Sequence, residues 1–384
     1  MRIIGLMSGT SIDGIDAALV EVTGEAYDIE VNLIRGQTTA YSAGVRSQLL
    51  ETCAGHPLSV EALVTLDDAV ADTFAEAALA LANGDAIDLI ASHGQTIYHR
   101  PPANNALGYS LQIGRGARIA AQTGYPTVSN FRAADIALGG QGAPLVPPVD
   151  ACLLSHTSRD RCIQNLGGIG NVAYLPAWNR RQQQQFPDQI QGWDTGPANV
   201  LIDWAVAEFS GGAQTYDEDG RWAAQGRIHS ALVRQWLSHP FFSQVPPKST
   251  GRELFGADYA QHCWQQAQAM GLTQADFLAS LTEFTAASIE QGYRQFLPQL
   301  PDEVLLCGGG SHNRYLRQRL QNRLPEVTLT TTDQVGLHAD YKEAIAFAVL
   351  GFWRWHGLPG NLPAVTGASA FCPLGELTGG HLPS

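Results

Sequence analysis

The residues best suited to chemistry lie in one short turn near the N-terminus. Small residues, two hydroxyls and two carboxylates follow each other there, in the order Gly9-Thr10-Ser11-Ile12-Asp13-Gly14-Ile15-Asp16. A tight turn of this kind exposes backbone N–H groups, which can bind an anion. Gly9 and Gly14 have the spacing of a Walker A motif, but Ile15 stands where that motif requires a lysine. The segment is therefore not a P-loop, and an anion-binding turn and an ordinary hairpin turn both remain open.

Two more glycine-rich turns occur later in the chain. Gly168-x-Gly170-x-x-Ala173 matches a loose dinucleotide pattern, but strand-type residues follow it where a Rossmann unit needs a helix. Gly308-Gly309-Gly310 lies between a strand-type and a helix-type segment, with Glu326 downstream. This third turn fits either a Rossmann unit or a plain strand-to-helix turn.

Two further polar segments are candidates for catalysis or binding. Asp194 lies between glycines in Gly192-Trp193-Asp194-Thr195-Gly196-Pro197, where a carboxylate could take a proton or bind Mg²⁺ through water. The residue types alone favour another interpretation, in which Asp194 or Thr195 caps a helix beginning near Pro197. His93-Gly94-Gln95-Thr96 forms a polar cluster at a strand end, as ligand-contacting loops often do, although a single histidine is more often structural. Neither H-E-x-x-H nor G-x-S-x-G occurs, so metalloproteases and α/β-hydrolases have no support.

The hydropathy pattern predicts which elements hold these turns. The first two turns each join two short strands, over 3–7 and 15–22 and over 162–166 and 172–175, and this echo suggests a duplication. The glycine- and proline-dense stretch at 139–148 indicates a domain boundary. Further strands are expected over 88–92, 127–132 and 303–307. Helical spacing is expected over 60–83, 111–122, 198–209, 226–237, 255–270, 274–296, 313–323 and 342–356.

Composition excludes several classes of protein. The 384 residues include 23 Lys+Arg and 36 Asp+Glu, a net charge of −13, which argues against a nucleic-acid binder and a polybasic membrane anchor. A hydrophobic share of 45% indicates a globular protein, and the length indicates two domains. The six cysteines form no C-x-x-C pair, and we expect free thiols in a reducing compartment. Because no signal-type or membrane-spanning run is present, we expect a cytoplasmic protein.

Taken together, the three glycine turns resemble the phosphate and base sites of the actin, hexokinase and Hsp70-type ATPases. Across essentially its whole length the sequence resembles the anhydro-N-acetylmuramic acid kinases. Six segments carry this resemblance: 5–16, 92–96 (SHGQT), 130–132 (NFR), 139–144 (GGQGAP), 165–171 (NLGGIGN) and 194–197 (DTGP).

The resemblance implies an α/β fold of the two-domain actin-like ATPase (ribonuclease H-like) type, with duplicated domains and an interdomain cleft. The domains would be 1–138 and 139–384, with the last helix or tail returning to the first. The implied reaction uses ATP and Mg²⁺ to open 1,6-anhydro-N-acetylmuramic acid with water and to phosphorylate O6, in peptidoglycan recycling. A homodimer is also implied. A kinase of the same fold acting on an ordinary hexose or amino sugar is the alternative, and a dehydrogenase or a non-catalytic sugar sensor has less support.

The resemblance also implies roles for individual residues. Asp194 would be the general base, and Asp13 or Asp16 would hold Mg²⁺. ATP would contact Gly9, Thr10, Ser11, Ile12, Asp13, Gly14, Ile15, Asp16, Gly168, Gly170, Asn171, Gly308, Gly309 and Gly310. For the sugar we expect His93, Gln95 and Arg132, with Glu343 as a further candidate. Arg132 suits the lactyl carboxylate, because a guanidinium binds a carboxylate through two parallel hydrogen bonds.

Overall fold

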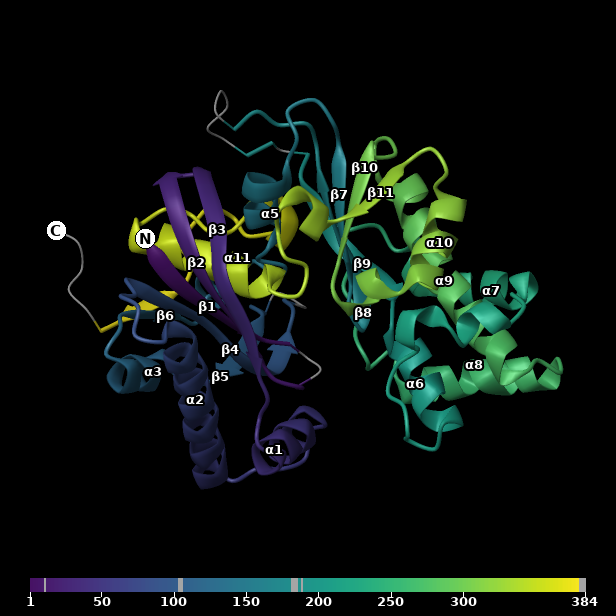
Figure 1. Ribbon diagram of the computed structural model, residues 1–384, viewed down its shortest axis with the longest axis horizontal. Coiled ribbons are helices and arrows are strands. Elements are labelled where there is room, and N and C mark those ends of the chain that lie inside the picture. The colour runs from purple at the N-terminus through teal and green to yellow at the C-terminus, as the bar shows by residue number, and fades with distance from the viewer. Residues whose placement is uncertain (10–11, 103–105, 181–185, 188, 380–384) are drawn as a thin grey trace. The chain divides into compact units, whose positions relative to one another are not determined.

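The computed structural model describes residues 1–9, 12–102, 106–180, 186–187 and 189–379. Contacts divide the chain into two compact units, both built from strands and helices (Figure 1). The first comprises 1–154, 180–188 and 340–384, and the second comprises 155–179 and 189–339. The first unit thus runs beyond the expected boundary at 138, because the helix α5 (Pro147–Leu154) packs against elements of that unit. Within the described residues, none of the helices has the length and apolar character needed to cross a bilayer.

The sheet of the first unit has β1 and β4 at its centre. Its strands follow the order β12 (Glu376–Thr378), β6 (Thr127–Ser129), β4 (Leu89–Arg100), β1 (Arg2–Ser8), β2 (Ile15–Glu25) and β3 (Asp28–Thr39), and β5 (Tyr109–Ile113) pairs with β4. The sheet of the second unit follows the order β11 (Thr328–Thr331), β10 (Glu303–Cys307), β7 (Arg161–Leu166), β8 (Ile169–Leu175) and β9 (Gln191–Pro197).

The two sheets repeat one topology. In the first, β1, β2 and β3 are antiparallel neighbours, and β4 and then β6 join the other side of β1 in parallel. In the second, β7, β8 and β9 are antiparallel neighbours, and β10 and β11 join the other side of β7 in parallel. The α/β class and the duplication expected from the sequence are therefore confirmed.

Helices cover the first sheet on opposite faces. The helix α2 (Val60–Ala82) forms one core with alternate residues of β1 and β2, such as Leu6 and Leu19. The helix α11 (Lys342–Trp355) packs on the other face, where Gly5 allows a close approach. A Cβ at Gly5 would lie only 1.9 Å from the carbonyl oxygen of Ala344. This close packing fixes the beginning of α11 above the N-terminal strands. The remaining helices of the unit are α1 (Ala43–Cys53), α3 (Gly116–Thr123), α4 (Ala133–Ala137) and α12 (Pro363–Thr366).

The core of the second unit is organised around α9 (Gln274–Phe296), whose bounds match the sequence expectation. Its buried face includes Phe277, Phe284 and Tyr293, all fully buried. The other α-helices of this unit are α6 (Val200–Phe209), α7 (Ser230–Leu237), α8 (Ala257–Ala269) and α10 (Arg314–Arg323).

The sequence expectations about local structure differ from the structure in several places. The helix expected over 111–122 begins only at Gly116, because β5 occupies 109–113 and Gly114, with φ at +96°, turns the chain between them. The strand expected over 127–132 ends at Ser129. The strands β3 and β9 were not expected, since β3 is mostly half-buried or exposed and β9 is interrupted by glycines.

Candidate active site

The first glycine turn joins β1 to β2, and a residue of β4, Gln95, forms hydrogen bonds with it. The Ser8 hydroxyl bonds the carbonyl oxygen of Gly14 at 2.8 Å and Gln95 Oε1 at 2.6 Å. Gln95 Nε2 donates to the carbonyl oxygen of Gly9 at 3.2 Å, and Ile12 has a φ of +53°. Buried side chains of the same unit therefore shape both ends of the turn. Thr10 and Ser11, also expected at this site, lie outside the described residues.

Asp13 and Asp16 lie beside this turn. Asp13 is exposed, whereas Asp16 is half-buried and accepts a hydrogen bond from the Thr38 hydroxyl at 2.6 Å. Burial raises the pKa of Asp16, and the nearby carboxylates of Asp13 and Asp340 add to this effect. Extra negative charge near Asp16 is therefore unfavourable unless a cation is present. Within the described part of the chain no group of three or more His, Cys, Asp or Glu side chains could hold a metal. The arrangement fits Mg²⁺ bound by one or two carboxylates together with phosphate oxygens.

Arg132 and His93 form a buried polar pair in the first unit. Arg132 donates from Nε and Nη2 to His93 Nε2, at 3.1 and 2.8 Å, and from Nη1 to the carbonyl oxygen of Gly142 at 2.6 Å. His93 Nδ1 lies 2.9 Å from the carbonyl oxygen of Gly94. Burial and the Arg132 charge hold the pKa of His93 well below its usual range, so the ring is neutral and accepts at Nε2.

These bonds leave Arg132 with one N–H on each terminal nitrogen. A guanidinium has five N–H groups, and three of those on Arg132 are used by His93 and Gly142. The two that remain belong to Nη1 and Nη2, the pair that can hold both oxygens of a carboxylate. Burial lowers the pKa of Arg132 to about 10, while Glu343 and Asp135 oppose this shift, and the side chain stays charged at neutral pH.

Glu343 and Gln95 differ in their availability for a ligand. The side chain of Glu343 is accessible to solvent at the beginning of α11, although the surrounding protein raises its pKa; Lys342 and Arg132 oppose that rise and Asp16 adds to it. Glu343 thus interacts electrostatically with both Asp16 and Arg132. Gln95 is fully buried, and its amide already bonds Ser8, Gly9 and other groups of its own unit. In this structure Gln95 supports the glycine turn, and its contact with a sugar stays a prediction.

Asp194 lies in the middle of β9 in the second unit, half-buried. Its N–H donates to the carbonyl oxygen of Lys248 at 3.0 Å, and its Oδ2 accepts from the Thr250 N–H at 2.8 Å. No hydrogen bond joins Oδ1 to any of the residues that the structure describes. The capping interpretation is wrong, because α6 begins at Val200 and the residue at its N-terminal cap is Asn199.

The electrostatic surroundings of Asp194 suit a general base. Burial raises its pKa to about 7; the Thr250 amide and Lys248 oppose this rise, and Glu253 contributes to it. A carboxyl group with a pKa near the working pH accepts a proton far more readily than an ordinary aspartate.

Lys248 is a functional candidate that the sequence did not reveal. Burial lowers its pKa to about 8, and Asp194 opposes this shift. Its Nζ donates to the carbonyl oxygen of Phe241 at 3.1 Å and lies 4.6 and 4.7 Å from the ring centres of Phe241 and Phe296. The only feature of the sequence that could have drawn attention to it is that the chain contains just two lysines.

The second glycine turn lies next to Asp194 in the sheet. The register of β8 and β9 pairs Asn171 with Asp194, so both side chains lie on one face of the sheet. Gly170 is needed for this close approach, because a Cβ there would lie 2.6 Å from the Thr195 hydroxyl. The carbonyl oxygen of Gly168 accepts from the N–H of Val200 at 3.0 Å, which ties the turn to the beginning of α6. The expected base and the expected phosphate turn of the second unit are therefore neighbours.

The third glycine turn packs against the end of β7. Gly308 has a φ of +76°, and a Cβ there would lie 2.3 Å from Asn165 Oδ1. Gly309 and Gly310 begin a short 3-10 helix that precedes α10. The strand, turn and helix expected here are present, and β10, α10 and β11 form a parallel β–α–β unit. The sheet as a whole is not of the Rossmann type, because β7, β8 and β9 are antiparallel neighbours.

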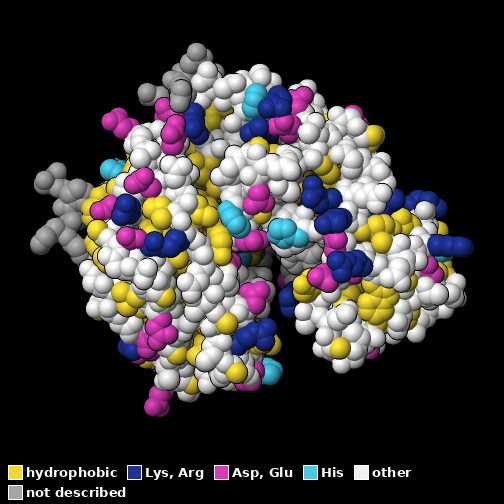
Figure 2. Space-filling view, viewed as in Figure 1, with side chains coloured by type: hydrophobic (Ala, Val, Ile, Leu, Met, Phe, Trp, Pro, Cys, Tyr) yellow, Lys and Arg dark blue, Asp and Glu magenta, His cyan; other side chains and the backbone are white. Residues whose placement is uncertain are grey.

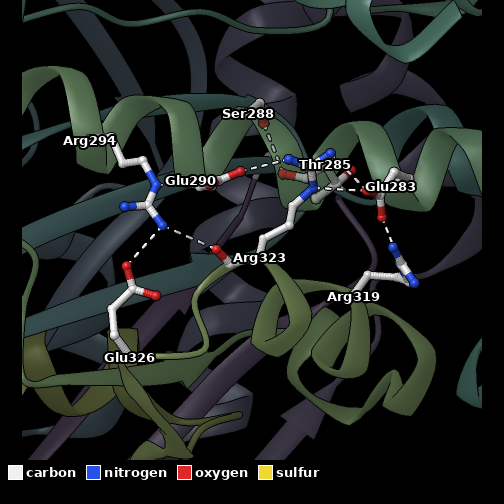
Figure 3. Close-up of polar contacts among 8 residues, drawn as sticks. All are labelled: Glu283, Thr285, Ser288, Glu290, Arg294, Arg319, Arg323 and Glu326. Atoms are coloured by element: carbon white, nitrogen blue, oxygen red, sulfur yellow. Dashed lines mark hydrogen bonds and ion pairs between the residues drawn. The ribbon is translucent and has the colours of Figure 1, made fainter. Parts of the chain in front are cut away.

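A series of ion pairs joins α10, the helix that follows this third turn, to α9 (Figure 3). Glu283, nearly buried on α9, accepts from Arg319 Nε at 2.6 Å and from Arg323 Nε at 2.9 Å. Arg323 also bonds Glu290 at 2.6 Å, and Glu290 in turn bonds Arg294 at 2.8 Å. Because Glu283 is nearly buried, losing either arginine would leave part of its charge unpaired.

On the face shown in Figure 2, Lys and Arg side chains and Asp and Glu side chains are both scattered over the surface.

Comparison with known proteins assigns the family. Solved structures similar to this chain include component A of (R)-2-hydroxyglutaryl-CoA dehydratase from Acidaminococcus fermentans, 11% identical over 92% of this chain and 98% of that chain, with a TM-score of 0.47. A ROK family glucokinase from Streptomyces griseus, in complex with glucose and AMPPNP, is 15% identical over 92% of this chain and 99% of that chain, with a TM-score of 0.39.

Curated relatives named anhydro-N-acetylmuramic acid kinase include those of Acaryochloris marina, 60% identical over 98% of this chain and 99% of the relative, and of Synechocystis sp., 58% identical over 98% of both. Residues 1–380 match the family described as anhydro-N-acetylmuramic acid kinase, and the chain belongs to that family.

Proposed function

We propose that this kinase converts 1,6-anhydro-N-acetylmuramic acid and ATP, with one water, into N-acetylmuramic acid 6-phosphate and ADP, in peptidoglycan recycling. The observation that carries the proposal is the environment of Asp194. One of its oxygens is held by the Thr250 amide, the other makes no hydrogen bond within the described residues, and its pKa is about 7. A cytoplasmic location and a homodimer complete the proposal.

The reaction needs one base and no separate acid. Asp194 takes a proton from water as the water oxygen forms a bond to the anomeric carbon of the sugar. The bond from that carbon to O6 breaks, and its electron pair stays on O6. O6 then bonds the γ-phosphorus of ATP as the bond to the bridging oxygen breaks and ADP leaves. The proton resides on Asp194 until solvent removes it. The removal of the proton from water by Asp194 resembles the base step of an inverting glycosidase, and the phosphoryl group takes the place of the general acid.

Arg132 is the group we assign to the lactyl carboxylate of the sugar. Its two available N–H groups, on Nη1 and Nη2, match the two oxygens of a carboxylate. His93 holds the opposite edge of this guanidinium through Nε and Nη2. An ordinary hexose has no carboxylate to fill the site, so the arrangement favours the anhydro-muramic substrate over the alternative.

The phosphates of ATP require backbone amides and a cation, because neither glycine turn carries a lysine. We assign the phosphates to the turns at 9–16 and 168–171, and the adenosine to 308–310. Asp13 and Asp16 would hold Mg²⁺. The pKa of Asp16, raised first by burial and further by the Asp13 and Asp340 carboxylates, supports this role, because a bound cation would offset these effects. When bound, Mg²⁺ supplies positive charge that offsets the charge of the transferred phosphoryl group.

A substrate panel tests the proposal directly. The purified chain is incubated with ATP, Mg²⁺ and either 1,6-anhydro-N-acetylmuramic acid, N-acetylmuramic acid, N-acetylglucosamine or glucose, and sugar phosphates are identified by mass spectrometry. We expect phosphorylation of the anhydro-sugar to exceed that of the others by orders of magnitude. Equal or faster phosphorylation of glucose or N-acetylglucosamine would establish the ordinary sugar kinase instead.

A further inference from the structure

We propose that Asp135 is a positioning residue that sets the orientation of Arg132, and thereby the recognition of the sugar's carboxylate. The inference rests on the proposed role of Arg132. Asp135 itself lies behind the site and would not touch the substrate.

Asp135 is completely buried, and its carboxylate holds together two distant segments of the first unit. Oδ1 accepts from the Asn361 amide at 2.9 Å and from the Thr366 hydroxyl at 2.7 Å. Oδ2 accepts from the N–H of Gly142 at 2.8 Å. A buried carboxylate is costly unless such donors surround it. Here three of them do, and two come from the C-terminal part of the chain.

A single residue, Gly142, links Asp135 to Arg132 through its backbone. Gly142 donates its N–H to Asp135 and accepts from Arg132 Nη1 at its own carbonyl oxygen, at 2.6 Å. Gly142 has a φ of +70°, and a Cβ there would lie 2.7 Å from Ile136 Cγ1, so this conformation requires glycine. Gly140 has a related function, because a Cβ there would lie 2.2 Å from Asp135 Oδ2.

Releasing Gly142 would free one side of the Arg132 guanidinium. His93 would still bond Nε and Nη2 through its single atom Nε2, but without Gly142 the guanidinium plane could tilt about that contact, and the last N–H of Nη1 would no longer be held in one direction. Both N–H groups must point at the ligand for a carboxylate to be held by two bonds. The loss should therefore concern carboxylate recognition and not the nucleotide.

The variant Asp135→Asn tests this step, because asparagine replaces one of the two accepting oxygens by an N–H₂ group. That group would face a donor and lose its hydrogen bond, either with the Gly142 N–H or with Asn361 and Thr366. We expect the KM for 1,6-anhydro-N-acetylmuramic acid to rise roughly tenfold to a hundredfold, as for a lost hydrogen bond to a charged group. The KM for ATP should stay within about twofold. The same assay with 1,6-anhydro-N-acetylglucosamine, which lacks the lactyl carboxylate, should show no rise. Thr366→Val removes one donor to Oδ1 only and provides a milder variant, with the same selectivity and a smaller effect.

A matched control is Asp67→Asn. Asp67 also accepts from the N–H of a glycine, Gly114 at 2.6 Å, in the same unit, and has no contact with Arg132. This variant should lower the melting temperature without a change specific to the muramic sugar.

Combining Asp135→Asn with Arg132→Ala distinguishes the two possible failures. In the Arg132→Ala background, Asp135→Asn should add less than about twofold to the KM for the sugar. If Asp135→Asn and Thr366→Val raise both sugar KM values alike, or if Asp135→Asn keeps its full effect without Arg132, the positioning role is refuted. If Arg132→Ala itself affects the two sugars equally, the assignment of Arg132 to the carboxylate is what fails.

Discussion

Replacing Asp194 by asparagine should make the protein more stable while it lowers turnover by orders of magnitude. The folded chain holds this carboxyl at a pKa of about 7, against 3.8 for an unperturbed aspartate, mainly because of burial. Ionised Asp194 is therefore disfavoured in the folded state, and asparagine removes the charge. Its amide oxygen can still accept from the Thr250 N–H.

The size of the gain follows from the two pKa values. A tenfold change in proton affinity corresponds to about 1.4 kcal/mol, so the difference between 3.8 and about 7 amounts to roughly 4 kcal/mol above neutral pH. Because Asp194 is only half-buried and solvent screens part of the cost, we expect about 2–4 kcal/mol. A domain of this size gains about 2–4 °C in melting temperature per kcal/mol. The variant should therefore melt roughly 5–10 °C higher at pH 8.

The pH dependence of this gain has a definite sign. Below about pH 3, aspartate is neutral in both the folded and the unfolded chain, and the two proteins should melt alike. Between pH 4 and 7 the folded chain binds the proton that the unfolded chain has lost, so the wild type loses stability as pH rises. The difference between variant and wild type should grow across this window and level off by about pH 8.

Thermal melts from pH 4 to 8, with turnover measured on the same samples, check this prediction. Turnover should fall by roughly a hundredfold to ten-thousandfold, as for the loss of a general base, while ATP binding survives. Asp203→Asn is the matched control, because burial also raises the pKa of Asp203 to about 7 and Arg252 only partly opposes it. That control should gain stability in the same pH window and keep its activity. An Asp194→Asn protein that melts no higher than the wild type at pH 8 would refute the raised pKa.

Two further predictions concern the base and the nucleotide turn. In the wild type, kcat/KM should rise tenfold per pH unit below a midpoint near 7 and level off above it, because only ionised Asp194 accepts a proton. The variant Lys248→Gln should move that midpoint to higher pH, because the lysine stabilises the carboxylate of Asp194. A midpoint near 4 in the wild type would contradict the assignment. Gly308→Ala should raise the KM for ATP but not that for the sugar, and cost about 1–3 kcal/mol of stability, because its φ of +76° is strained for any side chain. Isothermal titration with ATP and a melt measure the two effects, and unchanged ATP affinity would remove this turn from the nucleotide site.

The sequence was most informative where local pattern and fold agree. The two hairpins with glycine turns, the strand at 303–307 and the helix at 274–296 all follow from periodicity and glycine placement, and the structure has them. The repeated order of strands in the two sheets confirms the duplication that the hairpins suggested. These features depend on neighbouring residues, which a single sequence displays.

The features of the candidate site that the sequence could not show depend on contacts between residues that are distant in the chain. The sequence could not show that Asp194 lies in a strand beside Lys248 and Thr250, because that strand is interrupted by glycines and its partner segment is more than fifty residues away. It could not show that Arg132 uses three of its N–H groups within the protein. Nor could it show that Gln95 is engaged by the first glycine turn, since only the pairing of β1 with β4 brings Gln95 to Ser8.

The origin of the anomeric oxygen tests the central claim most directly. The enzyme is incubated with ATP, Mg²⁺ and 1,6-anhydro-N-acetylmuramic acid in ¹⁸O-labelled water, and the product is examined at once by mass spectrometry and NMR, before the free sugar can exchange its anomeric oxygen. A parallel sample of unlabelled product in labelled water corrects for that exchange. The account predicts one ¹⁸O at the anomeric carbon and none in the phosphate ester. Label in the transferred phosphate, or an unlabelled anomeric oxygen, would contradict it.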